Sequence, residues 1–148
     1  MKKYICFALG LALVTVLMGA SQSEDSRTLR VTVHYKGSGT VDSSHIIGVA
    51  IWDSPAFMEE HSQSMPLQVK LAKSNDTTVT FSGVSTSPVY VSAAYDPSGK
   101  WDGTSGPPPV GSSLGLYSKE PGKPEPVRIE PGKTESIHLS FDDTVKLK

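Results

Sequence analysis

The sequence contains a single cysteine, Cys6, which lies close to the N-terminus. With no second cysteine, the chain has neither an internal disulfide nor a cysteine-based metal site. Attachment of a lipid would require a cysteine at the end of the N-terminal apolar run, and Cys6 comes too early for that. The domain that follows must therefore be stabilised by packing alone.

The chain also lacks a hydrophobic run long enough to span a bilayer. Its one apolar run, residues 5–18, is shorter than the roughly 20 residues that a spanning helix needs. Lys2 and Lys3 precede this run and small residues follow it, which is typical of a cleavable signal peptide. We therefore expect residues 1–21 to be removed on export to the periplasm or the medium, leaving residues 22–148 as one domain without a membrane span. The alternative is an uncleaved N-terminal anchor.

No block of basic residues occurs anywhere in the chain. Its 14 Lys and Arg residues are balanced by 15 Asp and Glu residues, for a net charge of −1. Two of the basic residues, Lys2 and Lys3, lie in the predicted signal peptide, so the remaining domain is slightly acidic. Proteins that bind nucleic acid usually carry a basic patch, and we therefore expect no nucleic acid partner.

Helical periodicity is nearly absent, whereas short runs of alternating apolar and polar residues recur along the chain. Residues 29–35 alternate in this way, which predicts a strand with one face in a core. Residues 45–53 are apolar on both faces, which predicts a central strand that is covered on both sides. Pro55 suits the first position of a helix, and we expect one short helical turn within residues 56–64.

The second half of the chain continues the pattern of short strands. Residues 67–71 and 77–81 alternate on either side of a turn at Asn75 and Asp76, which predicts a hairpin. Residues 96–113 are rich in Gly and Pro and are predicted to form one long loop. The remaining predicted strands are residues 89–95, 114–117, 127–129 and 136–141. Seven or eight short strands separated by turns predict an all-β fold, an antiparallel β-sandwich of two packed sheets.

Three aromatic residues, Tyr95, Trp101 and Tyr117, lie in or beside the long loop. Exposed aromatic rings bind sugars or the apolar surface of another protein, and long loops in compact domains often carry function. Alternatively, Trp101 packs on the edge of the sandwich and covers the backbone of the loop. We expect residues 96–113 to bind an envelope protein or a glycan, with Trp101 as the main contact. Trp52, on a strongly apolar strand, is expected in the core.

Oxygen-bearing side chains at the start of this loop, those of Asp96, Ser98 and Asp102, have a spacing similar to that of calcium loops. Lys100 stands at a position where such a loop needs a ligand, and Asp142 with Asp143 could add charge if the last strand lies close. The alternative is that Asp96 and Asp102 bond to their own backbone in Asx turns. Calcium is the one cofactor that the sequence suggests, and a calcium-stabilised structural domain is the alternative function.

Residues 111–115 match the G-x-S-x-G pattern of a nucleophile elbow, with Ser113 as the nucleophile. Such an elbow needs a sharp turn from a strand to a helix on an α/β sheet, and the sequence predicts neither the helix nor that kind of sheet. A small serine hydrolase is therefore a third and less favoured hypothesis, and we expect a protein that is not an enzyme.

The four histidines are not spaced as metal ligands. His34 and His138 both fall on the polar faces of their predicted strands, the first and the last of the domain. They would form a cross-strand pair if those two strands were neighbours.

Three segments resemble small exported bacterial domains of the transthyretin-like or carboxypeptidase-regulatory-like type, namely residues 48–54, 89–102 and 131–143. In those domains a strand that ends in Asp is followed later by a loop rich in Asp and Gly. Asp96, Gly99 and Asp102 keep the outline of that loop, whereas Pro97 and Ser98 depart from it. The resemblance implies a seven-stranded prealbumin-like sandwich and a non-catalytic module of the cell envelope. The expected fold class is therefore a prealbumin-like or immunoglobulin-like sandwich.

Overall fold

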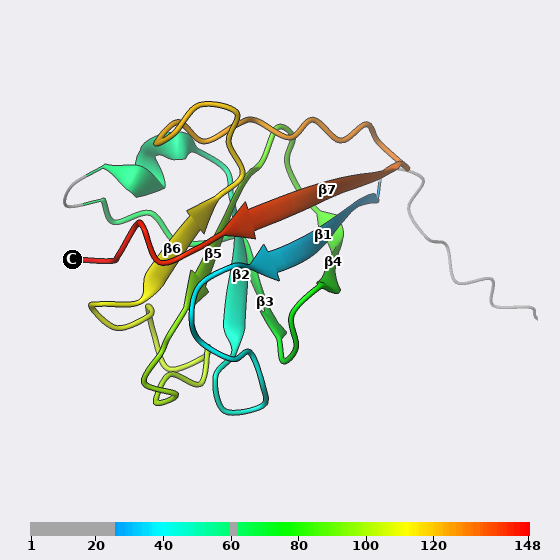
Figure 1. Cartoon of the computed structure of the whole chain (residues 1–148). Helices are drawn as coiled ribbons and strands as arrows, with labels where there is room; N and C mark the ends of the chain where they lie inside the picture. Colours follow the sequence, from blue (N-terminus) through cyan, green and yellow to red (C-terminus); the bar gives the residue numbers. More distant parts are fainter. Residues whose placement is uncertain (1–25, 60–61) are drawn as a thin grey trace, which may run out of the picture.

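The computed structural model describes residues 26–59 and 62–148, which form a β-sandwich of two sheets (Figure 1). One sheet has three strands in the order β4-β1-β7, and the other has four in the order β3-β2-β5-β6. The strands are β1 Arg27–Tyr35, β2 Ile47–Trp52, β3 Gln68–Ala72, β4 Thr77–Val84, β5 Tyr90–Tyr95, β6 Ser113–Leu116 and β7 Thr134–Phe141. The predicted all-β sandwich is thus confirmed, whereas the predicted signal peptide, residues 1–21, lies outside the described residues.

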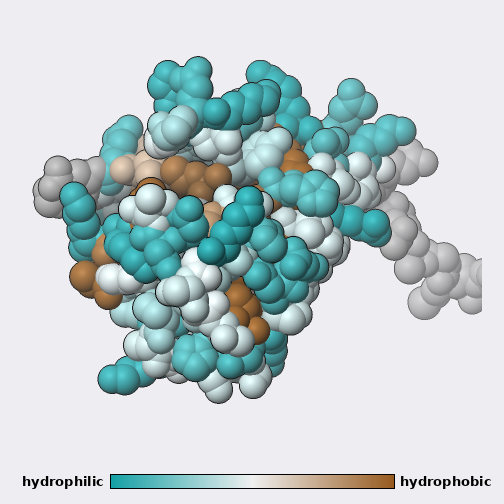
Figure 2. Space-filling model, viewed as in Figure 1, coloured by the Kyte–Doolittle hydropathy of each residue, from teal (hydrophilic) through white to brown (hydrophobic). Residues whose placement is uncertain are grey.

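Alternation along the strands decides which side chains enter the core. In β1, Leu29, Val31 and Val33 are fully buried, whereas Arg30 between them is exposed. Burying an aliphatic side chain of this size contributes about 1.5–3 kcal/mol. The outward-facing residues of β1 and β7 are polar, and Figure 2 accordingly shows a mostly hydrophilic face over these strands, with hydrophobic residues only in small separate patches. Among the described residues, no helix is long and apolar enough to cross a bilayer.

The predicted helical turn is a short 3-10 helix, Pro55–Met58, that follows β2. Ser54 caps it by accepting a hydrogen bond from the N–H of Ala56. Its Phe57 ring stacks on the Trp52 ring at a centroid distance of 4.5 Å. The helix thus covers one end of the outer face of the four-stranded sheet.

The predicted hairpin of residues 67–71 and 77–81 is wrong. β3 pairs with β2 in one sheet and β4 pairs with β1 in the other, so the turn between them carries the chain across the sandwich. Asn75 explains this crossing, because its side chain accepts the N–H of Tyr35 at 2.8 Å and donates to the C=O of Tyr35 at 2.7 Å. The turn is therefore fixed to the end of β1, where β4 begins its pairing.

The expectation of purely antiparallel sheets is also wrong, because β7 runs parallel to β1. After β6 the chain crosses along the side of the sandwich to the end where β1 begins, so β7 must start there too (Figure 1). The predicted strand at residues 127–129 belongs to this crossing and forms only a single bridge, between Val89 and Val127. The predicted strands at 29–35, 45–53, 89–95, 114–117 and 136–141 are confirmed within one or two residues at each end.

Gly115 in β6 lies close against Phe141 of the other sheet. A Cβ at this position would lie 2.6 Å from the Cβ and Cγ of Phe141. We expect Gly115→Ala to lower the free energy of unfolding by about 1–3 kcal/mol, because Phe141 is buried and has no room to retreat. Thermal unfolding measures this, with Ser136→Ala on the exposed face of β7 as the control. An unchanged melting temperature in Gly115→Ala would contradict this packing.

Candidate functional site

The long loop predicted for residues 96–113 is present between β5 and β6, and its first turn winds around one buried carboxylate. Asp96 is only 3% exposed. Its carboxylate accepts hydrogen bonds from the N–H and hydroxyl of Ser98, at 2.8 and 2.7 Å, and from the N–H groups of Lys100 and Trp101, both at 3.0 Å. Burial alone would raise the pKa of Asp96, but these donors outweigh it and lower the pKa below its ordinary value. A charged Asp96 therefore fixes the course of the loop.

A second carboxylate organises the next turn of the loop. Asp102 accepts the N–H groups of Thr104 and Ser105, both at 2.8 Å, and the hydroxyl of Ser105 at 2.6 Å. The bond from the Ser105 hydroxyl is the main reason why the pKa of Asp102 is lowered. Both Asp96 and Asp102 therefore bond to the backbone that follows them, as the alternative interpretation of Asx turns expected.

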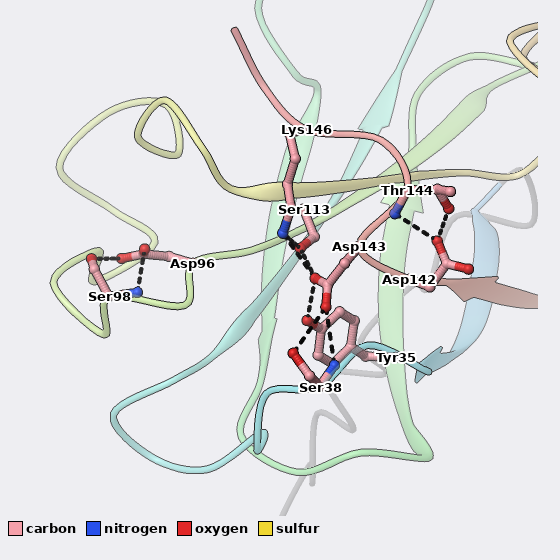
Figure 3. A network of polar contacts seen from close by, with 9 residues as sticks. All are labelled: Tyr35, Ser38, Asp96, Ser98, Ser113, Asp142, Asp143, Thr144 and Lys146. Carbon is pink, nitrogen blue, oxygen red and sulfur yellow. Dashed lines mark hydrogen bonds and ion pairs between the residues drawn. The ribbon is translucent and has the colours of Figure 1, made fainter.

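The oxygens proposed as calcium ligands are thus already bonded within the loop. Asp96 and Ser98 bond to each other, Asp102 serves a different turn, and Figure 3 shows Asp96 and Ser98 well apart from Asp143. Among residues 26–59 and 62–148, no group of three His, Cys, Asp or Glu side chains is placed to hold a metal ion. A calcium ion would have to share these oxygens with the N–H and hydroxyl donors of the loop, and calcium binding stays a prediction.

Trp101 packs against Gly48 of β2, on the outer face of the four-stranded sheet. A Cβ at Gly48 would collide with its ring, so the glycine makes the room that the ring occupies. The ring nitrogen donates to the C=O of Gly106 at 3.1 Å, which closes the loop over its own backbone. The packing role is therefore present, and the ring also remains partly exposed.

Two shallow depressions flank the exposed part of Trp101. One, of about 290 Å³, lies on the side of Ser105 and Pro107, and the other, of about 310 Å³, lies on the side of Ser44 and Lys73. Lys100, Trp101 and Asp102 belong to the walls of both. The loop thus presents an aromatic ring between two depressions that carry hydrogen-bonding side chains.

The other aromatic residues lie elsewhere. Tyr95 is 1% exposed, and it stacks on Tyr35 at 4.2 Å while its hydroxyl donates to the C=O of Thr40. This burial contradicts the expectation that Tyr95 offers an exposed ring. Tyr117 lies at the opposite end of β6 from the loop and packs against the core. The prediction that Trp52 lies in the core is wrong. Its side chain points to the outer face of the sheet, where the ring nitrogen donates to the Ser92 hydroxyl at 2.9 Å.

A polar cluster that the sequence did not predict surrounds the carboxylate of Asp143 (Figure 3). Its Oδ1 accepts the hydroxyls of Tyr35 and Ser113, both at 2.6 Å, and the Lys146 ammonium at 2.9 Å. Its Oδ2 accepts the N–H and hydroxyl of Ser38, at 3.0 and 3.2 Å. We call these five residues the Asp143 cluster. It joins β1 of one sheet to β6 of the other.

The cluster changes the acidity of two of its members. The bond from Lys146, followed by those from Ser113 and Tyr35, lowers the pKa of Asp143 far below its ordinary value. Burial, together with the bond to the Asp143 carboxylate, raises the pKa of Tyr35 to about 12. Asp143 is therefore an anion and Tyr35 a neutral donor throughout the physiological range. The cluster was missed because its members are far apart in the sequence and follow no spacing rule.

Ser113, the proposed nucleophile of a hydrolase, belongs to this cluster. Ser113 is 0% exposed. Its hydroxyl donates to Asp143 and accepts a hydrogen bond from Lys146 at 2.8 Å. It opens strand β6 and follows no strand-to-helix turn. A buried hydroxyl that donates to a carboxylate does not face a substrate, so this geometry gives no support to the hydrolase hypothesis.

The first and last strands, β1 and β7, are neighbours, but their pairing does not bring the two histidines together. His138 lies opposite Thr32 and His34 lies opposite Ser140. His34 instead contacts Asp76, with 2.5 Å between Nδ1 and Oδ1. The register therefore offsets the imidazoles by two residues.

Comparison with known proteins yields no family model and no curated protein sequence that match this chain. Among solved structures, an alternative pilotin from the type II secretion system of Vibrio cholerae is similar with a TM-score of 0.47 and 11% identity, over 83% of this chain and 98% of that one. The major pilin from Streptococcus pyogenes follows with a TM-score of 0.26 and 15% identity, over 80% of this chain and 48% of that one. These distant likenesses do not indicate what the chain does. The resemblance to transthyretin-like domains stays a prediction.

Calcium binding is tested by thermal unfolding with excess calcium and then with a chelator, at constant ionic strength. We expect the same melting temperature in both, because the carboxylates of Asp96 and Asp102 are already bonded to the loop. A ligand that binds only the folded state raises the melting temperature. A rise of several degrees with calcium would contradict this expectation and support Asp96, Ser98 and Asp102 as candidate ligands.

Replacing Asp143 by Asn keeps the shape of the side chain but removes the charge that Lys146 and three hydroxyls contact. We expect Asp143→Asn to lower the free energy of unfolding by about 1–3 kcal/mol at pH 7, as measured by urea denaturation. Asp142→Asn is the matched control, because Asp142 is exposed and, within the described part of the chain, hydrogen-bonds only to Thr144. Equal effects of the two substitutions would show that the cluster contributes nothing special.

The stability difference between the wild type and Asp143→Asn should also depend on pH. Since the pKa of Asp143 is lower in the folded than in the unfolded chain, its stabilisation is present above the unfolded pKa of about 4 and is lost as the pH falls below it. The difference in stability between the wild type and Asp143→Asn should therefore narrow between pH 5 and pH 2. A constant difference in stability from pH 5 to pH 2 would show that the charge of Asp143 does not stabilise the fold.

Proposed function

We propose that this chain is an exported, non-enzymatic binding module of the cell envelope that takes a glycan or a protein through the loop of residues 96–113. The observation that carries the proposal is the partly exposed Trp101 ring between two shallow depressions. Export is supported by the basic, apolar and small-residue pattern at the N-terminus.

The loop is organised before any ligand arrives. Asp96 and Asp102 together accept seven hydrogen bonds from residues 98–105, and the Trp101 ring nitrogen bonds to Gly106. A loop that is already ordered loses little conformational freedom on binding, which favours affinity. This order supports a role in recognition for a segment whose composition alone would suit a mobile connection.

The chemistry of the depressions favours a glycan as the ligand. An aromatic ring offers an apolar plane, and Lys100, Asp102 and Ser105 beside it offer charged and hydroxyl groups for hydrogen bonds. Each depression is at or below the lower end of the roughly 300–1,000 Å³ typical of small-molecule sites. The surface therefore suits one or two sugar rings, or a few side chains of a protein, better than a large cofactor.

Tryptophan fluorescence tests the proposal, because the chain has only two tryptophans. In Trp52→Phe, Trp101 is the one remaining reporter, and we expect a saturable change on titration with soluble chitooligosaccharides or peptidoglycan fragments. Lys100→Ala in this background should weaken the binding severalfold, whereas Lys133→Ala, an exposed lysine next to β7, should not. Circular dichroism verifies that each variant is folded.

Absence of any change across the sugars would reject the glycan as ligand. If an immobilised wild-type domain then retained an envelope protein that the Lys100→Ala domain did not, the loop would be a protein-binding surface. If neither type of ligand depended on Lys100 or Trp101, the loop would be structural only and the proposal would be wrong.

A further inference from the structure

Residues 145–147, which we call the strap, lie along the outer edge of β6. The C=O of Val145 accepts the N–H of Leu114 at 2.9 Å, the N–H of Leu147 donates to the C=O of Ser112 at 2.9 Å, and the C=O of Leu147 accepts the N–H of Gly111 at 2.8 Å. β6 is the last strand of its sheet. The strap therefore covers a sheet edge that would otherwise present free N–H and C=O groups.

The middle residue of the strap enters the Asp143 cluster. The Lys146 ammonium donates to the Ser113 hydroxyl at 2.8 Å and to Asp143 at 2.9 Å. Asp143 also accepts hydrogen bonds from Tyr35, Ser38 and Ser113, none of which belongs to the strap. The acceptor for a cation is thus held in place without the strap.

The strap itself is held lightly. It has three main-chain bonds and the two bonds of the Lys146 ammonium, and its apolar burial is limited, since Val145 is 53% exposed and Leu147 is only partly buried. The ion pair of Lys146 with Asp143 is also partly open to solvent, which weakens it. A competing strand that makes the same bonds can replace it when its concentration exceeds the effective concentration of the tethered strap.

We propose that the edge of β6 is a strand-addition site that takes an extended peptide with a lysine between two apolar residues, in place of the strap. Strand addition supplies affinity through main-chain hydrogen bonds and specificity through pockets for alternate side chains. Here the main-chain groups are those of residues 111–114, and the specific pocket is the pair of Ser113 and Asp143. This surface goes beyond the proposed glycan or protein site on the loop and does not depend on it.

The strap acts as a built-in competitor in this proposal. A ligand binds more weakly in proportion to the fraction of molecules whose site is closed. Weakening the strap should therefore strengthen the binding of an added peptide, which is the opposite of what damage to a binding site would do.

The experiment uses full-length protein and a fluorescently labelled peptide with the sequence of residues 144–148, Thr-Val-Lys-Leu-Lys. By fluorescence anisotropy, Lys146→Ala should bind this peptide about fivefold more tightly than the wild type does. A peptide with Glu at the position of Lys146 should bind at least about tenfold more weakly to Lys146→Ala, whereas Glu at the position of Lys148 should have a smaller effect. Ser113→Ala added to Lys146→Ala should also weaken the binding.

Amide hydrogen exchange then identifies the surface. Bound peptide should protect the N–H groups of Gly111 and Leu114 in Lys146→Ala. Equal binding to wild type and Lys146→Ala, or no binding to a Lys146→Ala protein that circular dichroism shows to be folded, would overturn the proposal. Protection confined to residues 98–105 would also overturn it, because the peptide would then occupy the loop. Loss of sugar binding by the loop would leave these results unaffected.

Discussion

The carboxylate of Asp143 is the interaction on which one whole end of this sandwich depends. It collects donors from β1, from the loop after β1, from β6 and from the strap, so that one anion ties both sheets together. The single cysteine of the chain excludes an internal disulfide for this task. The cluster is also only partly buried, so that the cost of removing the charges from water, which is large for fully buried ion pairs, stays moderate.

The same logic operates in the loop between β5 and β6. Its composition is that of a flexible connection, yet Asp96 and Asp102 replace the missing β-sheet partners by accepting the N–H groups of the loop itself. At the other end of the loop, Gly111 and Ser112 bond to Leu147. Both ends are therefore fixed by hydrogen bonds, and Trp101 between them is held over the space that Gly48 leaves open.

Alternation of apolar and polar residues was enough to predict most strands, because it reflects a local property, the burial of one face. Pairing is not local. The alternation around Asn75 is the same for a hairpin and for a crossing, and the two bonds from Asn75 to Tyr35 decide between them. Likewise, the position of Tyr95 next to a long loop does not reveal that its ring stacks inward on Tyr35. In the Asp143 cluster, Tyr35 bonds to Asp143 across 108 positions of the chain, and the sequence offers no pattern for such a contact.

The strap and the loop meet at Gly111, near the end of the loop. Its N–H donates to the C=O of Leu147 in the strap, and its φ of 92° is one that glycine adopts readily. Exchange of the strap for another strand that makes the same main-chain bonds would preserve this end of the loop, whereas an empty edge would release it. Under the proposed strand addition, the Trp101 surface would then be better ordered with the edge filled than with it empty.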